Sequence, residues 1–189
     1  MTYTGDMKTV NGEGSRTAVF GGGCFWCTEA VFQMLKGVEE VEPGYAGGRL
    51  ENPSYERVSA GDTGHAEVIR VTYDPALTSY EDLLTVFFGS HDPTTPNRQG
   101  ADVGEQYRSV IFVADENEKR AARAKIQEIQ ESLKDGSRVV TGVLPFEKFF
   151  PAEDYHRNYF KTNTSAPYCQ LIIESKVEKV RKRFAELVK

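Results

Sequence analysis

The sequence contains no apolar run long enough to cross a membrane, and its first fifteen residues carry no apolar signal-peptide core. It also lacks an excess of positive charge. Over 189 residues the net charge is −5 at pH 7, and the isoelectric point is near 5.3. Neither nucleic acid nor an anionic membrane surface would attract such a chain. We therefore expect a cytoplasmic protein that binds neither of these partners.

Cysteine is scarce, with three residues in the whole chain. An odd count does not form a disulfide framework, which fits a reducing compartment. Cys24 and Cys27 have the C-x-x-C spacing of half a metal site, but no second C-x-x-C or H-x-x-x-H completes a tetrahedron. In a reducing compartment such a pair is more often catalytic than structural. The sequence therefore predicts redox chemistry without a metal.

The composition, 39% apolar and 27% charged, is that of one globular domain. Residues 1–15 are polar and glycine-containing, so we expect a flexible tail followed by a single catalytic domain over residues 16–189, as a monomer. Helices and strands alternate without the regular spacing of a parallel doubly wound sheet. The predicted fold is therefore α+β, a two-layer sandwich with helices packed on a mixed, mostly antiparallel sheet.

Periodicity and turn signals place the individual elements. Strands are predicted at 17–21, 38–48, 66–73, 107–114, 138–143 and 171–174, and helices at 24–35, 78–88, 115–133, 152–160 and 176–188. Thr78-x-x-Glu81 and Asp115-x-x-Glu118 resemble helix caps, and Pro43-Gly44 predicts a bend or bulge. Residues 48–64 and 91–104 are turn-rich, which is typical of long functional loops.

Cys24 follows three glycines and begins an apolar helix, at a predicted strand-to-helix turn. Glycine allows a sharp turn, and the free N–H groups of a first helical turn favour thiolate, the nucleophilic form. Phe25 and Trp26, the only tryptophan, would stand beside the sulfur as apolar walls. An inert core cysteine with core aromatics is the alternative.

Glu67 lies in an alternating strand, on the same face as Ile69, Val71 and Tyr73. An apolar setting raises the pKa of a carboxyl group, so Glu67 is a candidate acid; a glutamate at a sheet end is the more common case. His65 falls on the opposite face, and we leave it out of the chemistry.

Several longer motifs resemble those of the A-type peptide methionine sulfoxide reductases, in order along the chain after the tail. They are Gly23-Cys24-Phe25-Trp26, residues 44–48, Asn52-Pro53-Ser54-Tyr55, Gly64-His65-Ala66-Glu67, His91-Asp92-Pro93-Thr94, residues 97–109 and Pro167-Tyr168-Cys169. The resemblance implies reduction of the S-epimer of methionine sulfoxide, free or in oxidised proteins. It also implies no bound cofactor, and thioredoxin, or dithiothreitol in vitro, as the external reductant.

The resemblance also implies residue roles that agree with the chemistry, because a sulfoxide needs a thiol nucleophile, an acid for its oxygen and an apolar slot for its methyl group. It makes Cys24 the nucleophile, Glu67 the general acid, and Phe25 and Trp26 the methyl-binding wall. Three further residues would hold the sulfoxide oxygen and surround the acid, although each also fits an ordinary structural role: Tyr55, Asp102 and Tyr107.

Two thiols are candidates to resolve an oxidised Cys24. Cys27 lies within one helical turn, where disulfide geometry is restrictive. Cys169 follows a turn-rich segment and matches the resolving position of many relatives, so we favour Cys169 first, with Cys27 as competitor or relay. The chain has His156-Arg157 where the family usually has His-Gln, and we expect that helix to lie away from the sulfur.

Two other functions remain open from the residues. One is a thioredoxin-like disulfide oxidoreductase that uses Cys24 and Cys27. The other is a non-enzymatic methionine-binding module in which Trp26 and tyrosines form an aromatic slot.

Overall fold

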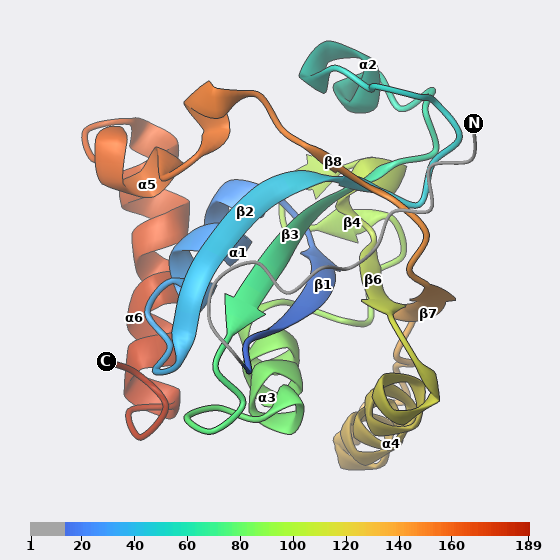
Figure 1. The fold of residues 1–189 in the computed structure, drawn as a ribbon, viewed down its shortest axis with the longest axis vertical. Coiled ribbons are helices and arrows are strands. Elements are labelled where there is room, and N and C mark those ends of the chain that lie inside the picture. The colour runs from blue at the N-terminus through green and yellow to red at the C-terminus, as the bar shows by residue number, and fades with distance from the viewer. Residues whose placement is uncertain (1–13) are drawn as a thin grey trace.

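The computed structural model describes residues 14–189, so the predicted tail falls almost wholly outside the described residues. Six strands form one sheet in the order β7-β6-β1-β3-β2-β8 (Figure 1). Their bounds are β1 Arg16–Gly22, β2 Val38–Ala46, β3 Ala66–Tyr73, β6 Ser109–Val113, β7 Gly142–Pro145 and β8 Phe149–Pro151. Only the β6–β7 pair is parallel, which confirms a mixed, mostly antiparallel sheet.

Four helices carry the buried residues that pack against one face of the sheet: α1 (Phe25–Phe32), α3 (Tyr80–Ser90), α4 (Glu116–Ser132) and α6 (Glu174–Arg183). The smaller elements are α2 (Tyr55–Ser59), α5 (Tyr159–Thr162), the 3₁₀ turns η1 (Glu105–Tyr107) and η2 (Asp154–His156), the π-helical turn η3 (Cys169–Ile173), and the small hairpin β4 (Arg98–Gln99) with β5 (Asp102–Val103). The predicted α+β class is confirmed. No helix within residues 14–189 is long and apolar enough to span a membrane.

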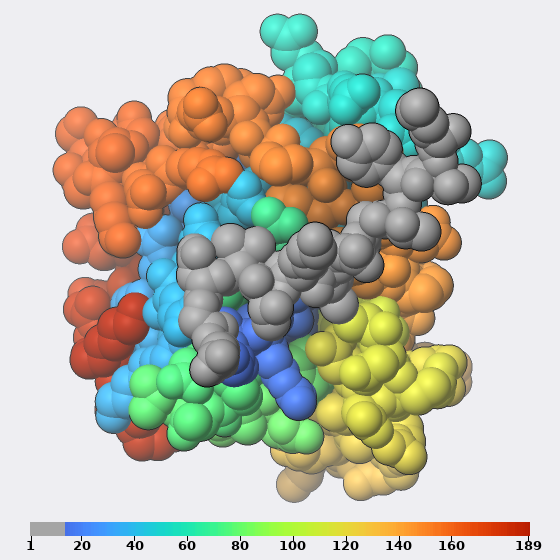
Figure 2. Space-filling model, in the orientation of Figure 1, coloured from blue at the N-terminus to red at the C-terminus, as the bar shows by residue number. Residues whose placement is uncertain are grey.

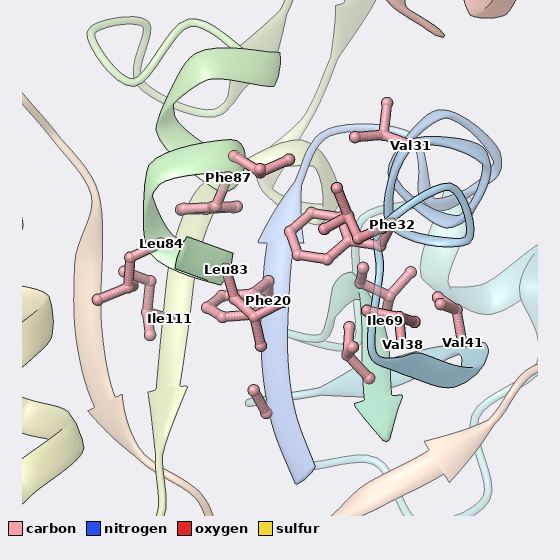
Figure 3. Packing of buried hydrophobic residues seen from close by; sticks show 14 of the residues in the cluster. Phe20, Val31, Phe32, Val38, Val41, Ile69, Leu83, Leu84, Phe87 and Ile111 are labelled. Carbon is pink, nitrogen blue, oxygen red and sulfur yellow. The ribbon is translucent and has the colours of Figure 1, made fainter. Parts of the chain in front are cut away.

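The main core lies between this sheet face and the helices (Figure 3). Phe20 of β1 packs between Phe32 of α1 and Phe87 of α3, with ring centroids 5.5 and 5.2 Å apart. On β3, Ile69 points into this core while Val68 belongs to a separate cluster. The predicted alternation of β3 is therefore confirmed, and Glu67 shares the side of Ile69.

The helix caps are close to those predicted. The carboxylate of Asp115 accepts the backbone N–H of Glu118 at 2.8 Å, as expected. The capping box of α3 lies one residue later than predicted, on Ser79 and Asp82, because Thr78 closes the preceding turn on Asp74.

Three predicted elements near the C-terminus are wrong. Residues 171–174 are not a strand: Cys169, Ile173 and Val177 are buried at helical spacing, and η3 runs directly into α6. The predicted helix 152–160 is divided into η2 and α5, because Asn158 adopts a left-handed φ of 54°. The strand predicted at 138–143 lies further on, as β7.

Smaller differences concern β6, β2 and two elements that were not predicted. The strand predicted from residue 107 begins at Ser109, because Tyr107 ends η1. The register shift of β2 occurs between Val38 and Glu40, whereas Pro43 and Gly44 pair with β3 in register. α2 and β8 lie in segments that carried no periodic signal.

Candidate active site

Cys24 lies at the predicted junction between β1 and α1. Gly23 has a φ of +93°, and a Cβ atom there would meet the Gln99 side chain at 2.7 Å, so both the turn and the close approach require glycine. Cys24 is the N-cap of α1, with non-helical backbone at φ −53° and ψ 124°, and its carbonyl accepts a hydrogen bond from the side-chain hydroxyl of Thr28 at 3.0 Å. Its side chain is buried.

The thiols of Cys24 and Cys27 are hydrogen-bonded to each other and titrate as a pair. That hydrogen bond lowers the pKa of Cys27 to about 7 against the opposing effect of burial, with Lys176 assisting. Burial raises the pKa of Cys24 well above 9, and the Cys27 thiol and the Glu67 charge add to it. Burial therefore opposes the thiolate form that the helix start was expected to favour on Cys24.

Glu67 is the second residue of β3, opposite Tyr45 of β2, and is only 2% exposed. Its Oε2 accepts the backbone N–H of Phe25 at 3.0 Å. Burial raises the pKa of the Glu67 carboxyl to about 8, the Phe25 hydrogen bond lowers it, and the charges of Asp102 and Cys27 raise it further. The expected apolar setting and raised pKa are confirmed. At neutral pH this carboxyl group holds a proton that it can donate.

The structure brings Tyr55, Tyr107 and Asp102 to this carboxyl group. Burial raises the pKa of both tyrosines, and for both the charge of Glu67 comes next. The ring of Tyr55 stacks on Phe25 at 6.3 Å. The charge of Asp102 raises the pKa of Tyr107 and of Glu67, so the three groups lie within electrostatic range of one another.

The two predicted wall residues differ in accessibility. The Phe25 side chain is wholly buried, with its ring 6.5 Å from that of Trp26. Trp26 is partly exposed, and the ring of Tyr159 stacks on it with a centroid distance of 3.7 Å and an interplanar angle of 6°. In this state the indole, and not the phenyl ring, forms the accessible part of the wall.

His156 was expected away from the sulfur, and this expectation is wrong. Its Nδ1 accepts the indole N–H of Trp26 at 3.0 Å, and its ring lies 5.0 Å from Phe25 and 4.5 Å from Tyr55. The segment after β8 lies against α1, where the buried carboxylate of Glu29 accepts the backbone N–H of Asn158 at 2.7 Å. The cluster of ring side chains from residue 155 to 159 was the signal that sequence reasoning missed.

All three cysteines are reduced and belong to one buried cluster. Burial and the charge of Cys27 raise the pKa of Cys169. Tyr168, which no sequence argument singled out, donates from its hydroxyl to Asp102 Oδ2 at 2.9 Å and lies 3.6 Å from the Cys27 sulfur. Its position before Cys169 was the available signal.

His65 lies outside this cluster. Its ring nitrogens contact the backbone N–H of Gly48 at 3.0 Å and the carbonyl of Leu50 at 2.8 Å, so it holds a loop. Within residues 14–189, no three His, Cys, Asp or Glu side chains are grouped to hold a metal ion.

A buried carboxylic acid beside a cysteine pair at a strand-to-helix turn, on an α+β sheet, defines a thiol-dependent oxidoreductase. The family model for peptide methionine sulfoxide reductase matches residues 16–188. The chain therefore belongs to the peptide methionine sulfoxide reductase family, as its motifs implied.

Individual relatives agree. The peptide methionine sulfoxide reductase MsrA of Sulfolobus acidocaldarius is 52% identical, over 89% of this chain and 95% of its own. Methionine sulfoxide reductase A of Corynebacterium diphtheriae superposes with a TM-score of 0.79 at 33% identity, over 82% of this chain and 78% of its own. Reduced Mxr1 of Saccharomyces cerevisiae superposes with a TM-score of 0.76 at 32% identity, over 86% of this chain and 94% of its own. Mxr1 has also been solved in complex with Trx2. That structure matches at 23% identity with a TM-score of 0.54, over 80% of this chain and 91% of its own.

Proposed function

We propose that the chain reduces methionine sulfoxide to methionine, taking the S-epimer both free and in oxidised proteins. The observation that carries this is the hydrogen bond that ties the neutral Glu67 carboxyl group to the amide following Cys24. It joins a proton donor and a thiol at one turn of the chain. Family membership supplies the substrate class.

The reaction balances on these two groups. The sulfur of Cys24 attacks the sulfoxide sulfur as Glu67 gives its proton to the sulfoxide oxygen, and the proton of the Cys24 thiol passes to the Glu67 carboxylate that this leaves. The sulfur–oxygen bond of the substrate breaks and the oxygen remains on Cys24 as a sulfenic acid. The substrate sulfur gains two electrons and Cys24 loses two.

The surrounding residues have supporting roles in this proposal. The hydroxyls of Tyr55 and Tyr107 hold the oxygen, while burial keeps the Glu67 carboxyl group protonated and the charge of Asp102 adds to this effect. Trp26, backed by Phe25, forms the slot for the methyl group. The mutual charge effects among the polar groups support their convergence on one substrate atom.

The sulfenic acid then condenses with a second thiol, which forms a disulfide and releases water. Cys27 and Cys169 both belong to the buried cluster of Cys24. We propose that thioredoxin reduces the resulting disulfide, as dithiothreitol does in vitro. The relative Mxr1, solved with Trx2, supports this partner.

We further propose that residues 16–189 act as one catalytic domain, as a monomer in the cytoplasm and without a bound cofactor. The family match spans nearly the same residues. The odd count of three cysteines fits a reducing compartment.

The test is to incubate the protein and dithiothreitol separately with methionine S-sulfoxide, methionine R-sulfoxide and an insulin-like disulfide. Methionine should form from the S-epimer alone. Cys24→Ser should be inactive, because a hydroxyl is a poor nucleophile at neutral pH. Full activity of that variant, or turnover of the disulfide alone, would reject the proposal.

A further inference from the structure

One carboxylate, that of Glu153, contacts three other elements behind the candidate active site. Its Oε1 accepts the backbone N–H of Tyr55, the first residue of α2, at 2.7 Å. Its Oε2 accepts the hydroxyl of Tyr45 in β2 at 2.8 Å and lies 3.7 Å from Nε2 of His156 in η2. None of the chemistry derived above uses Glu153.

The hydrogen bond from Trp26 fixes the state of the His156 ring. An indole nitrogen can only donate, so Nδ1 of His156 must be the bare, accepting nitrogen, and the proton of the neutral ring must sit on Nε2. Burial lowers the pKa of His156, so this neutral ring is the form present at neutral pH.

The buried Nε2 has no hydrogen-bond partner among the described residues, and the carboxylate oxygen Oε2 of Glu153 lies 3.7 Å from it. A negative charge there favours a proton on Nε2 and disfavours one on Nδ1. It thereby favours the tautomer that can accept the indole hydrogen bond of Trp26.

We propose that Glu153 is a positioning residue of the sulfoxide-reducing site, holding Tyr55 directly and the indole of Trp26 through the His156 tautomer. The proposal rests on the proposed function. It makes one group responsible for two sides of the substrate slot, the methyl-binding wall and a tyrosine that holds the oxygen. Glu153 itself touches no reacting atom.

The contact between the segments that carry η2 and α2 supports this positioning role. The segment that carries η2 lies against the segment that carries α2 on the surface of the molecule (Figure 2). These segments are about a hundred residues apart in the sequence, and the carboxylate of Glu153 joins them through the backbone N–H of Tyr55. The rings of Phe25, Tyr55 and His156 pack together there, with centroid distances of 6.3 Å or less.

The first experiment uses Trp26 as a reporter, because it is the only tryptophan in the chain. Glu153→Gln keeps the side-chain size but presents an amide N–H₂ that can donate to Nε2 of His156, which favours the wrong tautomer. We expect a shifted Trp26 emission maximum, and an about tenfold lower kcat/KM for methionine sulfoxide, within the range that misplacement costs. The preference for methyl over ethyl sulfoxide should fall as well. Glu56→Gln, an exposed position on α2, is the matched control and should change none of these.

A second pair of variants separates positioning from folding. The side-chain oxygen of His156→Asn can accept the indole hydrogen bond, whereas His156→Phe cannot. We expect wild-type emission and methyl preference in the asparagine variant and loss of both in the phenylalanine variant. In the His156→Asn background, Glu153→Gln should leave the Trp26 emission unchanged, because the tautomer no longer exists.

Unchanged emission and methyl preference in Glu153→Gln would overturn the proposal, as would the same effect of Glu153→Gln in both backgrounds. If Glu153→Gln does not fold, the two His156 variants provide the test. Equal Trp26 emission in His156→Asn and His156→Phe would then overturn the proposal. The emission measurements do not depend on turnover. An inactive wild type would therefore reject the proposed function, while the emission measurements would still test the linkage between Glu153 and Trp26.

Discussion

The carboxyl group of Glu67 accepts a hydrogen bond of 3.0 Å from the backbone N–H of Phe25, the residue that follows Cys24. The candidate acid on β3 is therefore attached to the same turn of chain that carries the candidate nucleophile on α1. Their relative position depends on backbone geometry, with few side-chain rotations between them. A single buried contact thus places both reacting groups.

Replacing Glu67 by Gln should slow the chemical step about 10²–10⁴-fold, the usual contribution of a general acid, with a smaller effect on binding. Because the pKa of Glu67 is about 8, the wild-type single-turnover rate should fall as pH rises through about 8, where the proton is lost. The variant should lack this decline. Rapid-quench measurement of methionine from pH 6 to 10 tests it, and an equal rate in the two proteins would remove Glu67 from the mechanism.

The same carboxyl group should make stability depend on pH. The folded pKa of about 8 lies above the ordinary 4.5, so the stabilisation is fully present below about 4.5 and is lost as pH rises through 8. Glu67→Gln does not ionise. Between pH 5 and 8 the wild type should therefore lose a few kcal/mol of unfolding free energy relative to the variant. Urea unfolding of both proteins at several pH values measures this difference, and a constant difference would contradict it.

The sequence predicted the sheet side of the site well. Strand alternation placed Glu67 beside Ile69, and the glycine run placed Cys24 at a strand-to-helix turn, because both depend on local backbone rules. The thiol charge was not predictable in the same way. It depends on burial and on the hydrogen bond to Cys27, which only the packed structure provides.

The C-terminal third was predicted least well, for a tertiary reason. Residues 153–159 have no regular period, and their position is set by distant carboxylate contacts, such as that of Glu29 with Asn158. The apolar run at 171–173 fits a strand or a helix equally over so short a length. Burial of Cys169 and Val177, four residues to either side of Ile173, decides for the helix.

Trp26→Ala should impair placement of the methyl group more than it impairs the chemistry. The indole is the accessible part of the wall and is held by Tyr159 and His156, so its loss leaves a wider slot. Relative kcat/KM values for methyl, ethyl and propyl sulfoxides should converge in the variant. A preference for methyl that matches the wild type would show that the indole does not form the slot.

The order in which the two resolving thiols act is the last testable point. Sequence reasoning favoured Cys169, because disulfide geometry within one helical turn is restrictive and because Cys169 follows a turn-rich segment and matches the resolving position of many relatives. Cys24 is the N-cap of α1, and its backbone is not helical. The Cys27 thiol is hydrogen-bonded to Cys24 and has a pKa of about 7, whereas burial raises that of Cys169. We therefore predict a Cys24–Cys27 disulfide first, followed by attack of Cys169 on Cys27.

Mass mapping after one equivalent of methionine sulfoxide, without reductant, tests this order. We expect Cys24–Cys27 at early times and Cys27–Cys169 later in the wild type. Cys169→Ser should stop at the first disulfide, and Cys27→Ser should accumulate sulfenic acid, because each disulfide needs a thiolate to form it. An early Cys24–Cys169 bond in the wild type, formed as fast in Cys27→Ser, would restore the original preference for Cys169. It would mean that the buried start of η3 opens before the neighbouring thiol can react.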